Sequence, residues 1–339
     1  MYRSMLHTGK GEGVAHGAGR GAGDDKGAEG GAGTGDGAGP DLAVRVGSIA
    51  LQNPVMTASG TAGCSAELSA YMDMSRLGAV VVKSLGHEPW PGNPPPRLRP
   101  VAGGMLNSVG LQGPGVEMWL RDQLPRLMAT GAIVVASIWG KTIDDYAKAA
   151  AMLQDAPDRV IAVEVNVSCP NLEDAEQMFS CSAEATAAAV RASDAARRPR
   201  WVKLSPAAPD LCRVAAAAVE AGAEAVTLVN TLPSSQVRGA RYAAGLGGAG
   251  GGLSGMPVHQ IAQRAIRECR AALGDVAIVG VGGVFNAGGA LELLAAGANA
   301  VQVGTATFLD PRAPVRVLCE LEDLCVRRGA RSLEELLGR

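Results

Sequence analysis

From residue 41 to the end of the chain, the pattern of apolar and polar positions alternates between two kinds of segment. Short runs rich in Val, Ile and Ala are followed by longer Ala- and Leu-rich stretches in which polar residues recur at helical spacing. Several short runs are apolar throughout, as is typical of parallel strands covered on both faces. The pattern therefore predicts strands at residues 55–58, 79–83, 132–138, 160–166, 201–204, 225–229, 276–280 and 300–303.

The longer segments between these runs are predicted to be helices. Five of them run into a glycine, a residue that accepts the left-handed conformation in which many helices end. Eight strand–helix units in a chain of this length indicate an α/β fold, the (β/α)8 or TIM barrel. Residues 42–46 and 48–51 are expected to form a hairpin that caps the barrel floor. The predicted helices span residues 65–77, 116–130, 143–155, 182–196, 209–221, 257–273, 287–296 and 312–328, and the five glycines are Gly78, Gly131, Gly222, Gly274 and Gly297.

Residues 1–40 differ in composition from the rest of the chain. Gly, Ala and Asp dominate this segment, and it offers almost no apolar surface to bury. Such a segment cannot recover the conformational entropy lost on ordering. We therefore expect a disordered extension at residues 1–40 and a single barrel domain at residues 41–339.

Composition and charge exclude several classes of protein. The net charge is −2, and no basic stripe indicates a nucleic-acid partner. The apolar stretches are shorter than the roughly 20 residues that a membrane-spanning helix needs, and no signal-peptide pattern follows the first residue. The seven cysteines form no Cys-x-x-Cys pair, which argues against a disulfide framework and against a zinc or iron–sulfur site. A reduced cytoplasmic protein is expected.

The polar residues of the apolar strands cluster where the strands end. In a TIM barrel the active site lies at the carboxyl ends of the strands, so these side chains are expected to meet. The polar residues concerned are Ser59, Lys83, Ser84, Ser137, Asn166, Asn171, Lys203, Asn230, Thr231 and Thr305, and the glycines Gly282, Gly283 and Gly304 follow the last two strands at the same end.

Three glycine-rich segments lie where this fold commonly binds phosphate. They are residues 251–255, 280–284 and 303–305, and the last two follow the final two strands. Their bare backbone N–H groups favour a phosphate-bearing ligand, although each segment by itself also fits a tight turn. No Gly-x-Gly-x-x-Gly motif stands in a βαβ unit, so a Rossmann dinucleotide site is not expected.

Two lysines and one cysteine can each be interpreted in two ways, one structural and one functional. Lys83 and Lys203 either extend outward to solvent or neutralise a buried anionic ligand. Cys169 is either a small buried apolar residue or a proton acceptor, and the bracketing Asn166 and Asn171 favour the second reading. Isolated histidines leave no candidate metal site and no Cys–His nucleophile pair.

The ordered motifs of the chain resemble those of class 1 dihydroorotate dehydrogenases. The resemblance spans roughly residues 42–320, and the form of residues 104–112 is most similar to the NAD-linked subclass 1B. The motifs are Lys-Ser-Leu (83–85), Pro-Gly-Asn-Pro-Pro-Pro-Arg (91–97), Gly-Met-Leu-Asn-Ser-Val-Gly-Leu-Gln (104–112), Asn-Val-Ser-Cys-Pro-Asn (166–171), Val-Lys-Leu-Ser-Pro (202–206), Asn-Thr (230–231), Gly-Gly-Leu-Ser-Gly (251–255) and Val-Gly-Thr (303–305).

This resemblance implies an FMN enzyme that oxidises dihydroorotate to orotate in pyrimidine biosynthesis. Cys169 would take the C5 proton while hydride passes from C6 to the flavin, and Lys203 would lie near the flavin N1–C2 carbonyl edge. The substrate would contact Lys83, Asn107, Ser108, Val109, Gly110, Leu111, Asn166, Asn171, Asn230 and Thr231. The cofactor would contact Ser59, Lys83, Ser84, Ser137, Asn166, Lys203, Val229 and Gly255, with its phosphate at Gly282, Gly283, Gly304 and Thr305.

The resemblance also implies protein partners. Subclass 1B pairs this subunit with a second one that carries FAD and a [2Fe–2S] cluster and passes electrons to NAD, and a homodimer of the present chain is expected within that heterotetramer. The electron acceptor stays open between NAD, fumarate and another oxidant.

The sequence departs from the family pattern at three places, and two alternative functions stay open. Ser137 stands where the family has Asn, Gly113 replaces another usual Asn, and residues 234–250 match nothing in the family. A flavoprotein similar to dihydropyrimidine dehydrogenase or dihydrouridine synthase is the alternative enzyme. A barrel without catalytic activity is the other alternative.

Overall fold

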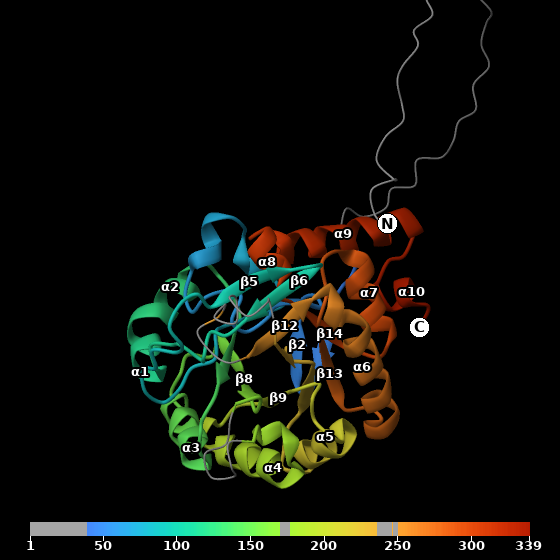
Figure 1. Ribbon diagram of the computed structural model, residues 1–339. Helices are drawn as coiled ribbons and strands as arrows, with labels where there is room; N and C mark the ends of the chain where they lie inside the picture. The colour runs from blue at the N-terminus through green and yellow to red at the C-terminus, as the bar shows by residue number, and fades with distance from the viewer. Residues whose placement is uncertain (1–38, 170–176, 236–245, 247–249) are drawn as a thin grey trace, which may run out of the picture. The chain divides into compact units, whose positions relative to one another are not determined.

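Eight parallel strands form the barrel that the sequence predicts (Figure 1). The computed structural model describes residues 39–169, 177–235, 246 and 250–339. The sheet runs in the order β3-β14-β13-β10-β9-β8-β7-β4, and a parallel bridge between Met56 and Ala79 closes the ring. The strands are β3 (Val55–Thr57), β4 (Val80–Val81), β7 (Val134–Ile138), β8 (Val160–Asn166), β9 (Arg200–Leu204), β10 (Ala225–Leu228), β13 (Ala277–Val281) and β14 (Ala300–Val303).

Seven of the eight predicted helical segments are present between these strands. The segment predicted at 116–130 is continuous but contains a π-helical turn, Trp119–Gln123, between α1 (Val116–Met118) and α2 (Leu124–Ala129). The others are α3 (Ile143–Met152), α4 (Ala183–Ala192) followed by the 3-10 turn Ser193–Ala196, α5 (Leu211–Glu220), α6 (His259–Leu273) preceded by the 3-10 turn Met256–Val258, α7 (Ala287–Ala295) and α9 (Ala313–Arg328).

The helix predicted at residues 65–77 is wrong. Two separate 3-10 turns, Glu67–Ala70 and Met74–Arg76, take its place. Asp73 adopts an extended conformation between them, and its carboxylate accepts a hydrogen bond from the Ser75 backbone N–H at 3.0 Å. A side-chain cap in the middle of the segment starts a new turn, so one continuous helix cannot form. Two short helices were not predicted, α8 (Ala306–Leu309) and α10 (Leu333–Leu337).

The barrel floor is closed by the predicted hairpin of β1 (Val44–Val46) and β2 (Ile49–Leu51). Val46 and Leu51 are buried against a cluster of barrel-interior residues that includes Met56 and Trp201. Polar side chains, among them Glu164 and Gln302, lie in the interior above this apolar layer. The barrel is therefore sealed at one end, and its polar groups lie toward the carboxyl ends of the strands.

A second sheet, which the sequence analysis missed, covers the open end of the barrel. It has four antiparallel strands in the order β11-β12-β6-β5, with bounds β5 (Leu98–Val101), β6 (Gly104–Asn107), β11 (Leu232–Ser234) and β12 (Gly251–Gly255) (Figure 1). Glycine has a low strand propensity, so the sequence of β12 predicts a turn and not a strand. Here glycine is needed because a Cβ on Gly251 would lie 2.4 Å from the Asn107 carbonyl oxygen of β6. Most of the unmatched segment 234–250 lies outside the described residues.

The remaining sequence predictions concern the amino terminus, the cysteines and the membrane. Residues 1–38 of the predicted extension lie outside the described residues, and Asp41 forms a parallel β-bridge with Ser332. All seven cysteines are free thiols, and Cys212 and Cys269 lie with their sulfur atoms 3.8 Å apart on α5 and α6. Within the described ranges, no helix is long and apolar enough to cross a bilayer, and no metal-binding cluster is present.

Candidate active site

A cavity of about 390 Å³ lies at the carboxyl ends of the barrel strands, bounded on one side by the second sheet. The structure brings almost all of the predicted site residues to its wall. These are Ser59, Lys83, Ser84, Asn107, Ser108, Val109, Gly110, Leu111, Asn166, Lys203, Val229, Asn230, Thr231, Gly255, Gly282, Gly283, Gly304 and Thr305. Of the other three predicted residues, Ser137 and Cys169 are fully buried behind the wall, and Asn171 lies outside the described residues.

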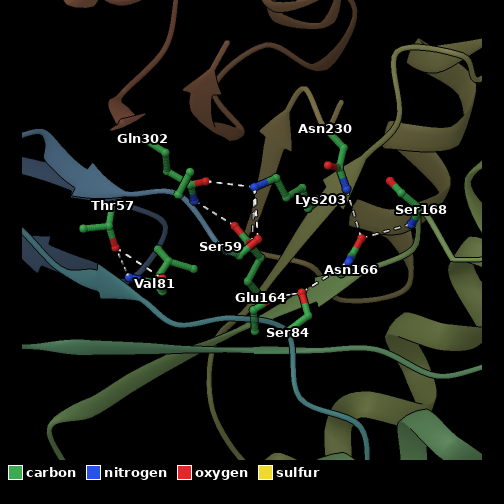
Figure 2. A network of polar contacts seen from close by, with 12 residues as sticks. Thr57, Ser59, Val81, Ser84, Glu164, Asn166, Ser168, Lys203, Asn230 and Gln302 are labelled. Carbon is green, nitrogen blue, oxygen red and sulfur yellow. Dashed lines mark hydrogen bonds and ion pairs between the residues drawn. The ribbon is translucent and has the colours of Figure 1, made fainter. Parts of the chain in front are cut away.

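A chain of hydrogen bonds joins the ends of four strands around Asn166 (Figure 2). The Asn166 amide donates to the Ser84 hydroxyl at 3.2 Å and accepts from the Asn230 amide at 3.2 Å. Ser84 in turn shares a 2.9 Å hydrogen bond with Ser137. Ser137, predicted as a cofactor contact, is therefore held one residue away from the cavity and orients Ser84. The network fixes which face of each amide and hydroxyl is presented to a ligand.

A buried ion pair lies directly below the cavity. The Lys203 ammonium is 3.8 Å from Glu164 Oε1, donates to Gln302 Oε1 at 3.1 Å and donates to the Ser59 hydroxyl at 3.3 Å (Figure 2). Gln302 also donates to Glu164 Oε2 at 2.7 Å, so the amide bridges the two charges. Burial lowers the pKa of Lys203, and the Glu164 carboxylate opposes that shift. Glu164 therefore stabilises the protonated form of Lys203 against the effect of burial.

Lys83 is the second cation of the cavity, and its surroundings differ from those of Lys203. Within the described residues, no carboxylate forms an ion pair with its ammonium. Burial lowers the pKa of Lys83, and the charge of Lys203 lowers it further, while Cys169 and Cys64 oppose the shift. A buried cation without a counterion is unfavourable, and an anionic ligand in the cavity removes that penalty. The site is therefore electrostatically suited to an anion.

Cys169 lies behind the wall, against the backbone of β8. Its thiol is 3.5 Å from the Asn166 carbonyl oxygen, which also accepts a 2.8 Å hydrogen bond from the Tyr146 hydroxyl. Burial raises the pKa of the Cys169 thiol to about 12, although the Lys83 charge and the nearby Tyr146 hydroxyl lower it. In this arrangement the thiol is protonated at neutral pH. The residues that follow it, 170–176, lie outside the described residues.

The loop after β6 forms one side of the cavity and is held from two directions. The Asn107 amide donates to the Gly252 carbonyl oxygen at 3.0 Å, which ties the loop to β12. The Asn93 amide donates to the Ser108 carbonyl oxygen at 3.1 Å. Gly110 has φ of 71°, and a Cβ there would lie 2.6 Å from the Asn93 side chain. Glycine at this position allows the loop to pack closely against Asn93, so contacts within the protein hold the conformation of the loop.

Glycines line the opposite end of the cavity, near β12, β13 and β14. Gly255 and Gly283 have positive φ, and a Cβ on Gly283 would lie 2.5 Å from the His259 Cβ. The Thr305 hydroxyl donates to the Ser254 hydroxyl at 2.8 Å, which joins the β14 and β12 segments. Backbone N–H groups of such a glycine-lined concavity suit an anionic group such as phosphate.

Sequence reasoning missed several residues that shape the site. Glu164 and Gln302 form the network under the cavity, Tyr146 contacts Cys169, and Asn93 and Ser168 line the wall. A signal for the first two exists in the sequence, because each is a polar residue flanked on both sides by valine within an apolar strand. A charged residue in such a segment is almost never buried without a partner. Tyr146 gives no such signal, since it occupies an ordinary core position of α3.

Comparison with known proteins adds an independent result. A family model described as dihydroorotate dehydrogenase matches residues 41–325. A relative from Desulforudis audaxviator, named dihydroorotate dehydrogenase B (NAD(+)), catalytic subunit, is 42% identical over 297 residues, which cover 87% of this chain and 96% of the relative. Relatives of the same name from Geotalea daltonii and Geobacter metallireducens are 39% and 38% identical over 300 residues, which cover 88% of this chain and 98% of each relative. The chain therefore belongs to the dihydroorotate dehydrogenase family, with class 1B catalytic subunits among its relatives.

Proposed function

We propose that this chain oxidises dihydroorotate to orotate and uses FMN as its flavin. The observation that carries the proposal is the position of Lys83, an ammonium without a carboxylate partner among the described residues, in a wall rich in amide side chains. Dihydroorotate has one carboxylate and a ring of amide N–H and C=O groups. An ammonium can bind the carboxylate, and Asn side chains can donate to and accept from the ring.

The residues of the cavity fit a flavin mononucleotide. Dihydroorotate dehydrogenases are flavoenzymes, and the bound flavin would supply the acceptor for a hydride. The glycine-lined end, with Gly282, Gly283, Gly304 and Thr305, would bind the phosphate, since backbone N–H groups of glycines in the cavity wall can donate to it. Ser59, Ser84, Val229 and Gly255 would contact the rest of the cofactor. Lys203 would lie at the flavin N1–C2 carbonyl edge, where a cation would stabilise the negative charge of the reduced flavin.

Cys169 is proposed to remove the C5 proton of the substrate. A thiol acts as a base only as thiolate, so the role requires its pKa to fall below the value that burial imposes in this structure. Two neighbours act in that direction, the Lys83 charge and the Tyr146 hydroxyl. The substrate would be held on the other side by Asn107, Ser108, Val109, Gly110, Leu111, Asn166, Asn230 and Thr231, and by Asn171 in the segment beyond the described residues.

We further propose that electrons leave this subunit through a partner protein. The relatives are named as the catalytic subunit of an NAD-linked enzyme, a name that implies a separate electron-transfer subunit. The partner would carry FAD and a [2Fe–2S] cluster. Two copies of the present chain would form the centre of a heterotetramer. Co-purification with an iron–sulfur flavoprotein from the native host would test this assembly.

Substrate choice tests the proposed activity. Purified chain is expected to show the visible absorption of oxidised flavin and to bleach with dihydroorotate but not with dihydrouracil, which lacks the carboxylate. Bleaching by dihydrouracil alone would favour an enzyme similar to dihydropyrimidine dehydrogenase. A colourless protein that binds no added FMN would favour a barrel without catalysis.

A further inference from the structure

His259 lies one layer behind the glycine-lined end of the cavity. It is the first residue of α6, and its side chain is only 4% exposed. The residue packs against the turn after β13, because a Cβ on Gly283 would lie 2.5 Å from the His259 Cβ and 3.1 Å from its Nδ1. Gly282 and Gly283 line the cavity from the other side of that turn.

Both ring nitrogens of His259 face hydrogen-bond acceptors. Nδ1 is 2.8 Å from the Gly282 carbonyl oxygen, and Nε2 is 2.7 Å from Glu292 Oε2 on α7. Gln263 also donates to Glu292 Oε2 at 2.7 Å, which holds that carboxylate in place. The Gln263 amide nitrogen also lies 3.1 Å from Nε2. A carbonyl oxygen can only accept, so the contact with Gly282 requires Nδ1 to donate.

The contact with Gly282 determines the direction of a backbone donor. The Gly282 carbonyl and the Gly283 N–H belong to the same planar, trans peptide unit, so they point in opposite directions. With the carbonyl fixed on His259, the Gly283 N–H is turned away from His259, toward the cavity. Among the described residues, no acceptor bonds this N–H, which leaves it free for a ligand.

We propose that His259, held by Glu292, is a positioning residue for the phosphate of the cofactor: it fixes the Gly282–Gly283 peptide so that its N–H donates to that phosphate. The proposal rests on the proposed function, which assigns the phosphate of FMN to this end of the cavity. His259 does not touch the cofactor itself. Its effect is confined to the phosphate group and leaves the isoalloxazine contacts unchanged.

The test compares FMN with riboflavin, the same flavin without phosphate, on full-length chain from which flavin has been removed. Dissociation constants are measured by flavin fluorescence for the wild type and three variants. His259→Asn keeps a donor near the Nδ1 position, His259→Gln keeps one near the Nε2 position, and His259→Leu keeps neither. We expect the Leu and Gln variants to bind FMN about tenfold more weakly, with riboflavin binding within about twofold of the wild type. The Asn variant is expected to retain the preference for FMN.

The outcomes separate this inference from the proposed function. A wild type that binds FMN and riboflavin equally would overturn both, because no phosphate is then recognised. A wild type that prefers FMN, together with Leu and Gln variants that keep the preference, overturns only the role of His259. Equal weakening of both flavins in every variant also overturns it and leaves His259 as a core residue. If the Leu variant does not fold, the contrast between the Asn and Gln variants decides.

Discussion

The ammonium of Lys203 lies 3.8 Å from the carboxylate of Glu164 in the interior of the barrel. Both side chains are almost completely shielded from water, at 4% and 0% exposure. Gln302 hydrogen-bonds to both, yet Glu164 Oε1 has no hydrogen-bond partner of its own among the described residues. The ion pair and the Gln302 hydrogen bond therefore together compensate for burying this carboxylate.

Removing the lysine alone should destabilise the protein more than removing both charges. Lys203→Met leaves Glu164 buried without a cation, which is expected to cost about 3–5 kcal/mol of unfolding free energy. Adding Glu164→Gln removes the uncompensated charge, so the double variant should recover part of that loss. Denaturant unfolding of the flavin-free chain measures both. Losses that simply add would show that the two charges are not coupled.

The strands around this ion pair could be predicted from the sequence, whereas the contacts between them could not. The strand predicted at 132–138 could be recognised because its run is almost entirely apolar, and the observed strand, Val134–Ile138, is buried throughout. Glu164 belongs to an equally apolar strand, but its partner Gln302 is 138 residues away, and only the closed barrel brings them together. The glycine strand Gly251–Gly255 was missed because backbone pairing with β6 forms it, and no side-chain pattern marks that pairing. The capping contact of Asp73 broke the helix predicted at 65–77.

Lys83 should give orotate binding a characteristic dependence on pH. In the proposed function its ammonium form would bind the carboxylate of the ligand, and burial lowers the pKa of Lys83 in the free protein. As pH rises through that lowered pKa, the dissociation constant of orotate is expected to increase about tenfold per pH unit, at a pH below the ordinary lysine range. Isothermal titration across alkaline pH measures this. Lys83→Met should bind weakly at every pH, and Lys148→Met, at an exposed lysine on α3, should match the wild type.

A methyl group at Gly283 should impair flavin binding through backbone geometry. Its φ of 67° is unfavourable for any residue with a Cβ, and that Cβ would lie 2.5 Å from the His259 Cβ. Gly283→Ala is therefore expected to lose most bound flavin and to unfold at a lower temperature. Gly113→Ala is the control, since a Cβ there would meet the Ser84 carbonyl oxygen at an ordinary 3.5 Å. Equal flavin content in the two variants would contradict the expectation.

The high pKa of Cys169 predicts how the rate of flavin reduction depends on pH. Burial raises the pKa of this thiol to about 12, so the thiolate fraction grows about tenfold per pH unit from neutral pH upward. If Cys169 is the base, the rate of flavin reduction by dihydroorotate in stopped flow should rise with pH along the same slope.

Cys169→Ala should keep its flavin and lose most turnover at neutral pH, while Cys181→Ala should behave as the wild type. Tyr146→Phe removes a hydroxyl that lowers the thiol pKa, so its rate should fall at each pH with flavin content unchanged. A Cys169→Ala variant with the wild-type rate would place the base elsewhere.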